Sequence, residues 1–350
     1  MSDSAFNQLI PYLKDTNIRS LWLADENLLS ANLRPNDAVT VIANRIDLEQ
    51  QLQKQDWKVL FSDYDFSIIE DNSLDQVIYR ISKEKLVVHH IINEAFRCLK
   101  EDGQLILAGD KGEGIKTYFS KAKKLFGEGE SSKADKDTWL AILSKHNEVS
   151  NKQLDDKNYH ELRVTCSDTQ HESSFEYYSK PGVFGWDKID KGSAYLIENL
   201  DSFLMTLIEP PKNALDLGCG YGYLSLNLSY LDIPVVATDN NAAAIKACER
   251  NFDRYPINGK VIAASCAEGI TEKFDLIVCN PPFHAGFSVD GDLTDRFLKA
   301  AHDRLHSRGV ACFVTNIHIP IERKAHQYFH QAECIMSNGN FKLVRLTHKM

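Results

Sequence analysis

Excess positive charge, paired cysteines and long apolar runs are all missing from this 350-residue chain. Its 40 lysines and arginines are outnumbered by 49 aspartates and glutamates, which gives a formal net charge of -9. This balance excludes a strongly basic nucleic-acid-binding chain, so any contact with RNA must use a local patch. No apolar run reaches the roughly 18 residues of a membrane-spanning helix, and the amino terminus has no apolar signal segment.

The eight cysteines contain no Cys-x-x-Cys pair, and their spacing fits neither a zinc site nor a disulfide framework. Several lie inside apolar runs, where cysteine acts as a small hydrophobic residue. We therefore expect a reduced, cytoplasmic protein that binds no metal. We also expect no association with a membrane, and a monomer.

Length and pattern predict two α/β domains, because short apolar strands alternate with amphipathic helices through the whole chain. We place the domains at 1–167 and 168–350. The polar, small residues of 127–138 predict an exposed loop. In the first half, strands are expected at 20–25, 39–45, 57–62, 76–81 and 104–108, and helices at 85–99 and 115–126.

The second half has a clearer pattern and ends in a predicted hairpin. Asn338-Gly339-Asn340 favours a tight turn, since Asn-Gly accepts positive φ. The hairpin strands are expected at 334–337 and 342–348. Further strands are expected at 214–217, 235–239, 261–265, 274–280 and 310–315, and helices at 222–231, 241–254, 292–306 and 321–331.

A faint internal repeat joins the halves, because residues 94–110 resemble residues 300–316. Both stretches have the pattern of a helix, a glycine and a buried strand, which any pair of α/β units could also share. The first copy has no glycine loop, and Arg80 stands where the second copy has an asparagine. We interpret the amino-terminal domain as a degenerate copy that binds rather than catalyses.

Asn280-Pro281-Pro282-Phe283 follows an apolar run that is typical of a strand buried on both faces. Ligands bind at the carboxyl ends of strands in open α/β sheets. There the Asn280 amide, the Pro281 carbonyl and the Phe283 ring suit an exocyclic amino group on a planar base. The alternative is a structural Asn-Pro turn that only ends a core strand.

The second motif is a glycine loop that begins at Asp216. Its spacing differs from the dinucleotide fingerprint, and a carboxylate there would repel pyrophosphate but suit an ammonium group. Asp239 lies 21 residues after the first glycine, at a strand end where a carboxylate can accept bonds from ribose hydroxyls. As an alternative, Asp239-Asn240 could cap a helix. The loop glycines are Gly218, Gly220 and Gly222.

Together, these motifs resemble those of Class I S-adenosylmethionine-dependent methyltransferases that modify amino groups. Residues 179–193, with Pro-Gly-Val-Phe before a later Gly-Ser, narrow the resemblance to the ribosomal RNA small subunit methyltransferase C family. The resemblance spans the chain and is strongest over 176–350. It implies two tandem Rossmann-like domains, of which the second is catalytic and has a seven-stranded sheet ending in an antiparallel hairpin.

The resemblance further implies methyl transfer from S-adenosylmethionine to N2 of a guanine in helix 34 of 16S rRNA, within the 30S subunit. It implies catalytic roles for Asn280, Pro281 and Phe283. Cys266 departs from the family pattern, because relatives often have Asn or Asp at this position. The cofactor contacts implied are Asp216, Gly218, Gly220, Gly222, Asp239, Asn240, Cys266 and Ala267. The substrate contacts implied are Phe184, Pro282, His284 and Lys188.

Several alternatives stay open at the level of side chains. His284 could be a packing residue, and Phe184 and Trp186 could be core aromatics instead of covering the site. The lysines near the site and a second group on the helix at 115–126 could contact phosphate or simply be solvated. The lysines in question are Lys180, Lys188 and Lys191, and then Lys111, Lys116, Lys121, Lys123 and Lys124.

Three other functions also fit parts of the pattern. A 23S rRNA guanine-N2 methyltransferase has a similar architecture. A glutamine-N5 protein methyltransferase shares Asn-Pro-Pro, but it normally carries Tyr where this chain has Phe283 and lacks a sheet domain in front. A non-catalytic RNA-binding module for ribosome assembly would have no need for intact Asp216, Asp239 and Asn280.

Overall fold

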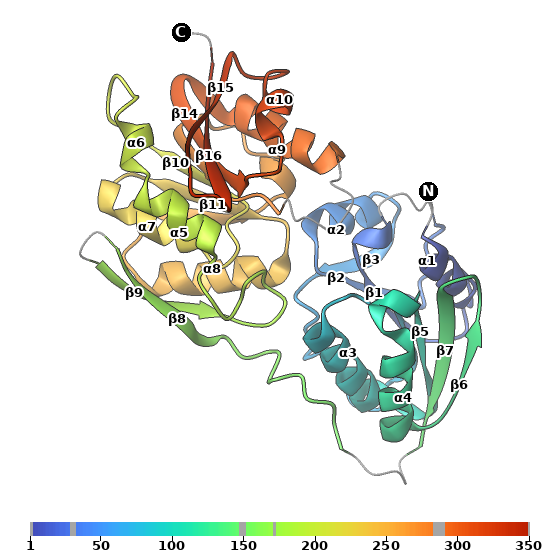
Figure 1. Cartoon of the computed structure of the whole chain (residues 1–350). Coiled ribbons are helices and arrows are strands. Elements are labelled where there is room, and N and C mark those ends of the chain that lie inside the picture. The colour runs from blue at the N-terminus through green and yellow to red at the C-terminus, as the bar shows by residue number, and fades with distance from the viewer. Residues whose placement is uncertain (1–2, 29–32, 147–151, 171–172, 283–290, 349–350) are drawn as a thin grey trace. The chain divides into compact units, whose positions relative to one another are not determined.

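The chain divides into two compact units, Met1–Glu161 and Leu162–Met350, in a computed structural model that describes residues 3–28, 33–146, 152–170, 173–282 and 291–348 (Figure 1). Each unit contains a seven-stranded sheet, and the strand order of the two sheets is the same: β3-β2-β1-β4-β5-β7-β6 and β12-β11-β10-β13-β14-β16-β15. The predicted tandem α/β fold is therefore confirmed. None of the helices described is both long and apolar enough to cross a membrane.

In the amino-terminal unit, helices cover both faces of the sheet (Figure 1). Leu21 and Leu23 of β1 pack towards α3 and α4, while Trp22 and Ala24 pack towards α1 and α2, as alternation along a strand requires. The strands are β1 Ser20–Ala24, β2 Val39–Ala43, β3 Lys58–Phe61, β4 Leu74–Arg80, β5 Leu99–Asp110, β6 Gly127–Lys133 and β7 Thr138–Lys145. The helices are α1 Ser4–Leu9, η1 Ile10–Leu13, η2 Glu26–Leu28, α2 Ile46–Gln53, α3 Lys85–Cys98, η3 Lys111–Glu113 and α4 Ile115–Phe126.

The prediction of an exposed loop at 127–138 is wrong, because most of this stretch forms strand β6. It pairs antiparallel with β7, from Gly127 opposite Lys145 to Lys133 opposite Trp139. β6 lies at the sheet edge, where it is held by backbone hydrogen bonds to one neighbouring strand, and most of its side chains are exposed. It therefore lacks the alternating apolar residues by which a strand is recognised in a sequence.

The carboxyl-terminal unit repeats this layout after a two-stranded ribbon, β8 and β9. The expected domain boundary after residue 167 lies within β8. The strands are β8 Arg163–Gln170, β9 Ser173–Ser179, β10 Ala214–Leu217, β11 Val235–Asp239, β12 Gly259–Ala263, β13 Phe274–Cys279, β14 Leu305–Asn316, β15 Gln331–Ser337 and β16 Phe341–Thr347. The helices are α5 Lys191–Glu198, α6 Asp201–Leu204, α7 Tyr223–Asn227, η4 Leu228–Leu231, α8 Ala242–Arg254, η5 Ser265–Ala267, α9 Gly291–Arg304 and α10 Ile321–Ala325.

Two apolar layers hold the second sheet. Ala214, Leu276 and Val278 face the layer with α5, α7 and α8, whereas Leu217 and Ile277 face the layer with α9 and α10. The central strands are buried on both faces, which is why they are continuous apolar runs in the sequence. The predicted terminal hairpin is present, since β15 and β16 pair antiparallel.

The internal repeat extends to a matching irregularity in the two sheets. The pairing of β4 with β5 shifts register between Leu74 and Gln76, and that of β13 with β14 shifts between Phe274 and Leu276. The aspartate skipped in each case, Asp75 or Asp275, accepts a backbone N–H from just before the neighbouring central strand, 3.0 Å from Arg19 N and 2.9 Å from Lys212 N. A shared detail of this kind favours duplication of one ancestral unit.

Candidate active site

Three strand ends bring the sequence motifs together in the carboxyl-terminal unit. β10 lies between β11 and β13, parallel to both, with Leu217 opposite Thr238 and Asp216 opposite Val278. The glycine loop, Asp239 and Asn280 therefore all leave the sheet at the same edge. This is the edge at which open α/β sheets bind ligands.

The glycine loop turns sharply into α7. All three glycines have positive φ, and the first anchors the turn by donating its N–H to Thr238 O over 2.9 Å. A Cβ on Gly220 would meet nothing within 4 Å, so the loop is open to space at its tip. A Cβ on Gly222 would lie 2.8 Å from the Sγ of Cys248, so this position has no room for a side chain. The tip can thus admit a ligand close to the backbone.

Asp216 is fully buried and holds the start of α7. Its Oδ2 accepts the backbone N–H of Ser225 at 3.0 Å and the Ser225 hydroxyl at 2.6 Å. Burial raises the pKa of this carboxyl to about 7, despite the Ser225 hydrogen bonds that lower it. Its other oxygen, Oδ1, is buried with no hydrogen-bond partner among the described residues. That oxygen is the one a ligand cation or a water could satisfy.

Asp239 links the glycine loop to the start of α8. Its Oδ2 accepts the N–H of Gly220 at 3.0 Å and its Oδ1 accepts the N–H of Asn241 at 2.9 Å. The cap of α8 is Asn241, whose side chain accepts from Ala243 N at 2.8 Å. The alternative of a helix cap at Asp239-Asn240 is therefore wrong. Both residues are half-buried in the turn, and each carboxylate oxygen of Asp239 accepts one backbone N–H.

Cys266 and Ala267 lie in η5, beside the end of β11, because Ala264 N donates to Asp239 O at 2.9 Å. Both adopt left-handed backbone conformations, with φ of 48° and 54°. Such conformations are uncommon outside glycine and point to functional sites when they cluster. Ser265 accepts from Arg296 of α9 at 2.6 Å, which ties η5 to the helix behind it.

Asn280 follows β13 directly, and its side chain is fixed by two acceptors. Its Nδ2 donates to Asp190 Oδ1 at 2.7 Å and to Ser193 Oγ at 2.8 Å. Pro281 is buried and Pro282 is exposed. The predicted contributions of Phe283 and His284 lie outside the described residues.

Residues 182–193, here called the edge segment, contact all three motifs. Asn241 Nδ2 donates to Gly182 O at 3.2 Å, and the Tyr221 hydroxyl donates to Lys188 O at 3.2 Å. Asp190 contacts the third motif, because its carboxylate accepts a hydrogen bond from Asn280 Nδ2. The stretch that narrowed the family resemblance thus runs along the candidate site. Sequence reasoning had given Asp190, Ser193 and Asn241 no role of their own.

The aromatic and basic residues of this region separate into surface and interior. Phe184 is 60% exposed, whereas Trp186 packs against the core and lies under the Arg163 guanidinium, 5.2 Å from its ring centroid. Lys180 is fully buried, so it cannot meet phosphate at the surface. Lys188 is exposed, as is Lys191.

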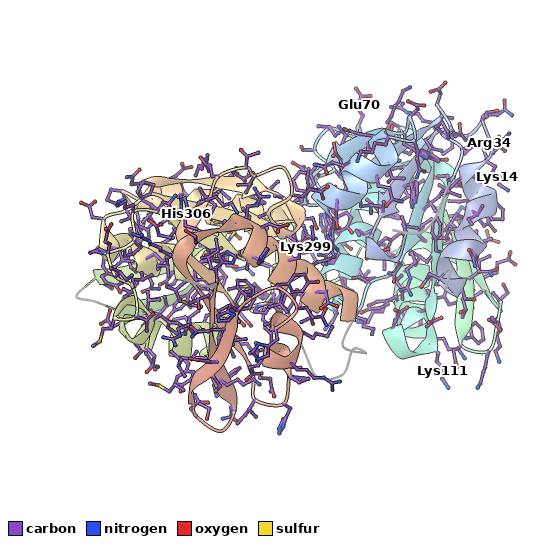
Figure 2. All side chains as sticks on the ribbon, turned by 90° about the horizontal axis from the view of Figure 1, so that it is seen from above. Lys14, Arg34, Glu70, Lys111, Lys299 and His306 are labelled. Atoms are coloured by element: carbon purple, nitrogen blue, oxygen red, sulfur yellow. The ribbon has the colours of Figure 1, made fainter. Side chains whose placement is uncertain are left out.

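The lysines on and beside α4 are only partly free. Lys121 Nζ lies 3.2 Å from His89 Nε2, and Lys123 Nζ donates to Gly129 O at 2.9 Å. Lys116 Nζ lies 3.9 Å from the ring centroid of Trp139. Lys111 extends from the surface of its unit (Figure 2), and Lys124 is exposed as well. A basic surface therefore exists here, although the ammonium group of Lys121 contacts the ring of His89.

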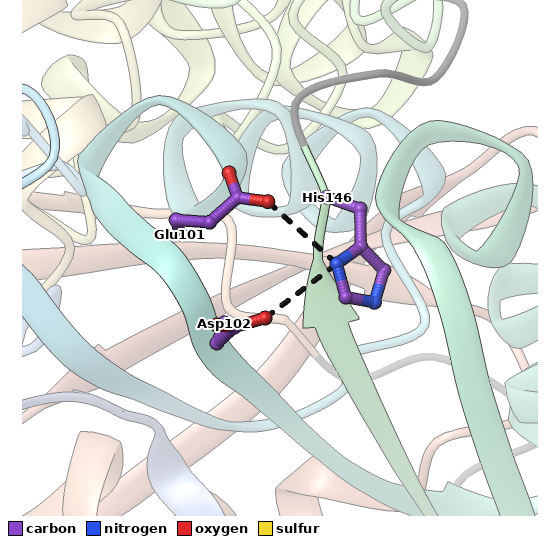
Figure 3. A group of neighbouring side chains, drawn as sticks. All are labelled: Glu101, Asp102 and His146. Atoms are coloured by element: carbon purple, nitrogen blue, oxygen red, sulfur yellow. Dashed lines mark ion pairs between the residues drawn. The ribbon is translucent and has the colours of Figure 1, made fainter.

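In the described ranges, one group of side chains has ligand atoms close enough for a metal ion. It consists of Glu101, Asp102 and His146 (Figure 3). His146 Nδ1 lies 3.7 Å from Glu101 Oε1 and 3.6 Å from Asp102 Oδ1, and its Nε2 bonds Glu128 at 2.9 Å. The Glu128 hydrogen bond and these acids raise the pKa of His146. These ion pairs with His146 account for the close approach of the three side chains.

Comparison with known proteins matches both units. The family model described as the methyltransferase small domain matches residues 174–345, and the model for its amino-terminal domain matches residues 20–174. Ribosomal RNA small subunit methyltransferase C of Shewanella pealeana is 26% identical over 335 residues, covering 95% of this chain and 94% of the relative. Its counterpart in Buchnera aphidicola is 30% identical over 173 residues, covering 49% of each chain.

A solved structure shares the whole two-unit fold. The 16S rRNA N2 G1207 methyltransferase of Thermus thermophilus, in complex with AdoMet and guanosine, superposes with a TM-score of 0.84. The match covers 99% of this chain and 92% of the other, at 23% sequence identity. The likeness establishes the fold over both units, including the unit that lacks the glycine loop.

Proposed function

The chain belongs to the methyltransferase small domain family, and we propose that it transfers a methyl group from S-adenosylmethionine to N2 of a guanine in 16S rRNA. The relatives named above are ribosomal RNA small subunit methyltransferases by name, and the Thermus structure, that of a 16S rRNA N2 G1207 methyltransferase, holds both AdoMet and guanosine. The single observation that carries the proposal is the Asn280 side chain, presented at the strand end beside the glycine loop.

The residues at the sheet edge fit S-adenosylmethionine. The loop tip at Gly220 has open space where a Cβ would stand. The unpartnered Oδ1 of Asp216 suits the amino acid ammonium, and Asp239 ends its strand where ribose hydroxyls would need acceptors. Cys266 and Ala267 would flank the adenine. When bound, the cofactor supplies an electrophilic methyl group on its sulfonium sulfur.

The chain's own residues act on the guanine amine. Its lone pair is delocalised into the ring, so the amine is a poor nucleophile. The Asn280 Oδ1 and the Pro281 carbonyl can each accept one of its N–H groups, which draws the nitrogen towards tetrahedral geometry and frees the lone pair for attack. The methylated amine then loses a proton readily, so no strong base is required. Phe283 is proposed as the stacking surface for the flipped base.

Some parts of the proposal are more specific than the family assignment. We place the target in helix 34 within an assembled 30S subunit and expect a cytoplasmic monomer. Asn240, Phe184, Pro282, His284 and Lys188 are proposed as secondary contacts around the two ligands. The amino-terminal domain, residues 1–167, is proposed to bind substrate, while residues 168–350 catalyse.

The test is to map guanine methylation in rRNA from a strain that lacks the gene. Loss of one N2-methylguanine in helix 34, restored by the wild-type gene but not by Asn280→Ala, is the expected result. In vitro, Asn280→Ala should keep its affinity for S-adenosylmethionine, while turnover falls at least about a hundredfold. Loss of a methyl group from 23S rRNA or from a protein glutamine would instead support the alternatives. Turnover within a few-fold of wild type would make Asn280 only a turn residue.

A further inference from the structure

We propose that Asp190 and Ser193 are positioning residues, which fix the Asn280 amide so that its oxygen faces the substrate amine. The inference deepens the proposed function and rests on it. Two acceptors from the edge segment converge on one amide nitrogen, at 2.7 Å and 2.8 Å. Such convergence on a side chain at the reacting site calls for a reason beyond packing.

Chemistry allows the amide only one useful orientation. A carboxylate accepts hydrogen bonds and donates none, so Asp190 selects the NH₂ of Asn280 and not its oxygen. A flipped amide would set two oxygens against each other and would present N–H groups to the guanine amine, which also carries N–H groups. Asp190 and Ser193 therefore decide whether Asn280 can accept from the substrate at all.

The two positioning residues are themselves fixed in place. Asp190 caps α5, and the Oδ1 that receives Asn280 also accepts the N–H of Ser193 at 3.0 Å. Ser193 is 7% exposed, in the first turn of α5. Asp190 thus has both a structural and a positioning contact, while the Ser193 hydroxyl contacts Asn280 without contributing to the cap. Ser193→Ala is the cleaner variant for this reason.

The decisive experiment measures transfer of labelled methyl from S-adenosylmethionine to 30S subunits purified from a strain lacking the gene. We expect Ser193→Ala to lower kcat roughly tenfold, within the range for misplacing a catalytic group by up to about 1 Å, with an unchanged KM for S-adenosylmethionine. In an Asn280→Ala background, assayed under single turnover, Ser193→Ala should have no further effect. Ser179→Ala is the matched control, because Ser179 has a buried hydroxyl with no partner in the described part of the chain.

Asp190 provides a second arm. Asp190→Asn keeps the cap and an acceptor oxygen and should retain most of kcat, whereas Asp190→Ala should lose as much as Ser193→Ala or more. Wild-type kcat in Ser193→Ala, a loss of equal size in the Asn280→Ala background, or a change confined to thermal stability would overturn the inference. A wild-type enzyme that methylates no 30S guanine would instead refute the proposed function, and the inference with it.

Discussion

At the scale of single residues, Asp239 allows the most direct test of cofactor binding. We expect Asp239→Ala to weaken S-adenosylmethionine binding by about 1.5–3 kcal/mol, the range for removing hydrogen bonds to a charged group. The variant removes the proposed ribose acceptor and also the contact that holds the glycine loop, since Asp239 accepts from Gly220 N at 3.0 Å. Calorimetric titration measures the change.

The matched control is Asp253→Ala, which removes an exposed carboxylate from α8 in the same unit. It should bind S-adenosylmethionine as wild type does. Equal affinity in Asp239→Ala and the control would remove Asp239 from the cofactor site.

Asp216 predicts a pH dependence of cofactor binding. Burial raises the pKa of the folded carboxyl to about 7, so ionisation costs the folded state, and stability falls as pH rises from about 4 to 7. A bound ammonium favours the ionised carboxylate. The affinity for S-adenosylmethionine should therefore rise about fivefold from pH 6 to pH 7, the gain in ionised fraction for a pKa near 7. It should decline above about pH 8, when the ligand amine deprotonates.

Asp216→Asn should abolish the rising limb while keeping an acceptor for Ser225. Calorimetry in buffers of different ionisation enthalpy measures the proton released on binding near pH 6.5. A wild-type protein that releases no proton there would separate Asp216 from the ligand ammonium.

At the scale of secondary structure elements, the sequence predicted what a pattern can encode. The helix expected at 115–126 matches α4, Ile115–Phe126, because its apolar positions recur at helical spacing and glycines flank it. The buried central strands were equally predictable from the sequence. The terminal hairpin followed from Asn338-Gly339-Asn340, where Gly339 has φ of 85°.

Contacts between distant residues were not predictable in the same way. β6 is polar and edge-bound, and β8 with β9 forms a ribbon outside both seven-stranded sheets. In the candidate site, Asp190 precedes Ser193 in a spacing that signals only a helix cap. Their approach to Asn280, ninety residues further on, depends on how α5 packs against the sheet, and no local pattern carries that information.

The turn from the glycine loop into α7 makes a prediction about stability. Gly222 has φ of 89°, and an added Cβ would lie 2.8 Å from Cys248 Sγ. Gly222→Ala should lower the free energy of unfolding by at least about 1–2 kcal/mol, the cost of a left-handed non-glycine residue. Adding Cys248→Ala should recover only the part of this destabilisation that comes from the clash with sulfur. Chemical denaturation of both variants measures this, and an unchanged midpoint in Gly222→Ala would contradict the strained turn.

At the scale of the whole molecule, the two units share one strand order, but only the second has the motifs at its strand ends. Arg80 lies five residues after the irregularity at Asp75, as Asn280 does after Asp275. Arg80 is 3% exposed, and its guanidinium binds Asp3 and Glu113 at 3.0 Å and 2.6 Å. β1 leads into η2 instead of a glycine loop. The first unit has thus filled its strand-end position with an ion-paired side chain, and we propose that its outer surface binds the substrate.

That surface supports a prediction about rRNA. The exposed lysines on α4 are Lys116, Lys123 and Lys124, and they give an acidic chain a local cluster of cations. Changing all three to Glu should weaken 16S rRNA binding and flatten its salt dependence by about one counterion for each phosphate that is no longer neutralised. Changing Lys14, Lys54 and Lys58, which are exposed elsewhere on the same unit, makes the same charge difference and should have little effect. Filter binding over a salt series measures both. Equal effects in the two triple variants would mean that net charge alone is responsible, and an unaltered slope in the first would assign rRNA recognition to the lysines of the edge segment.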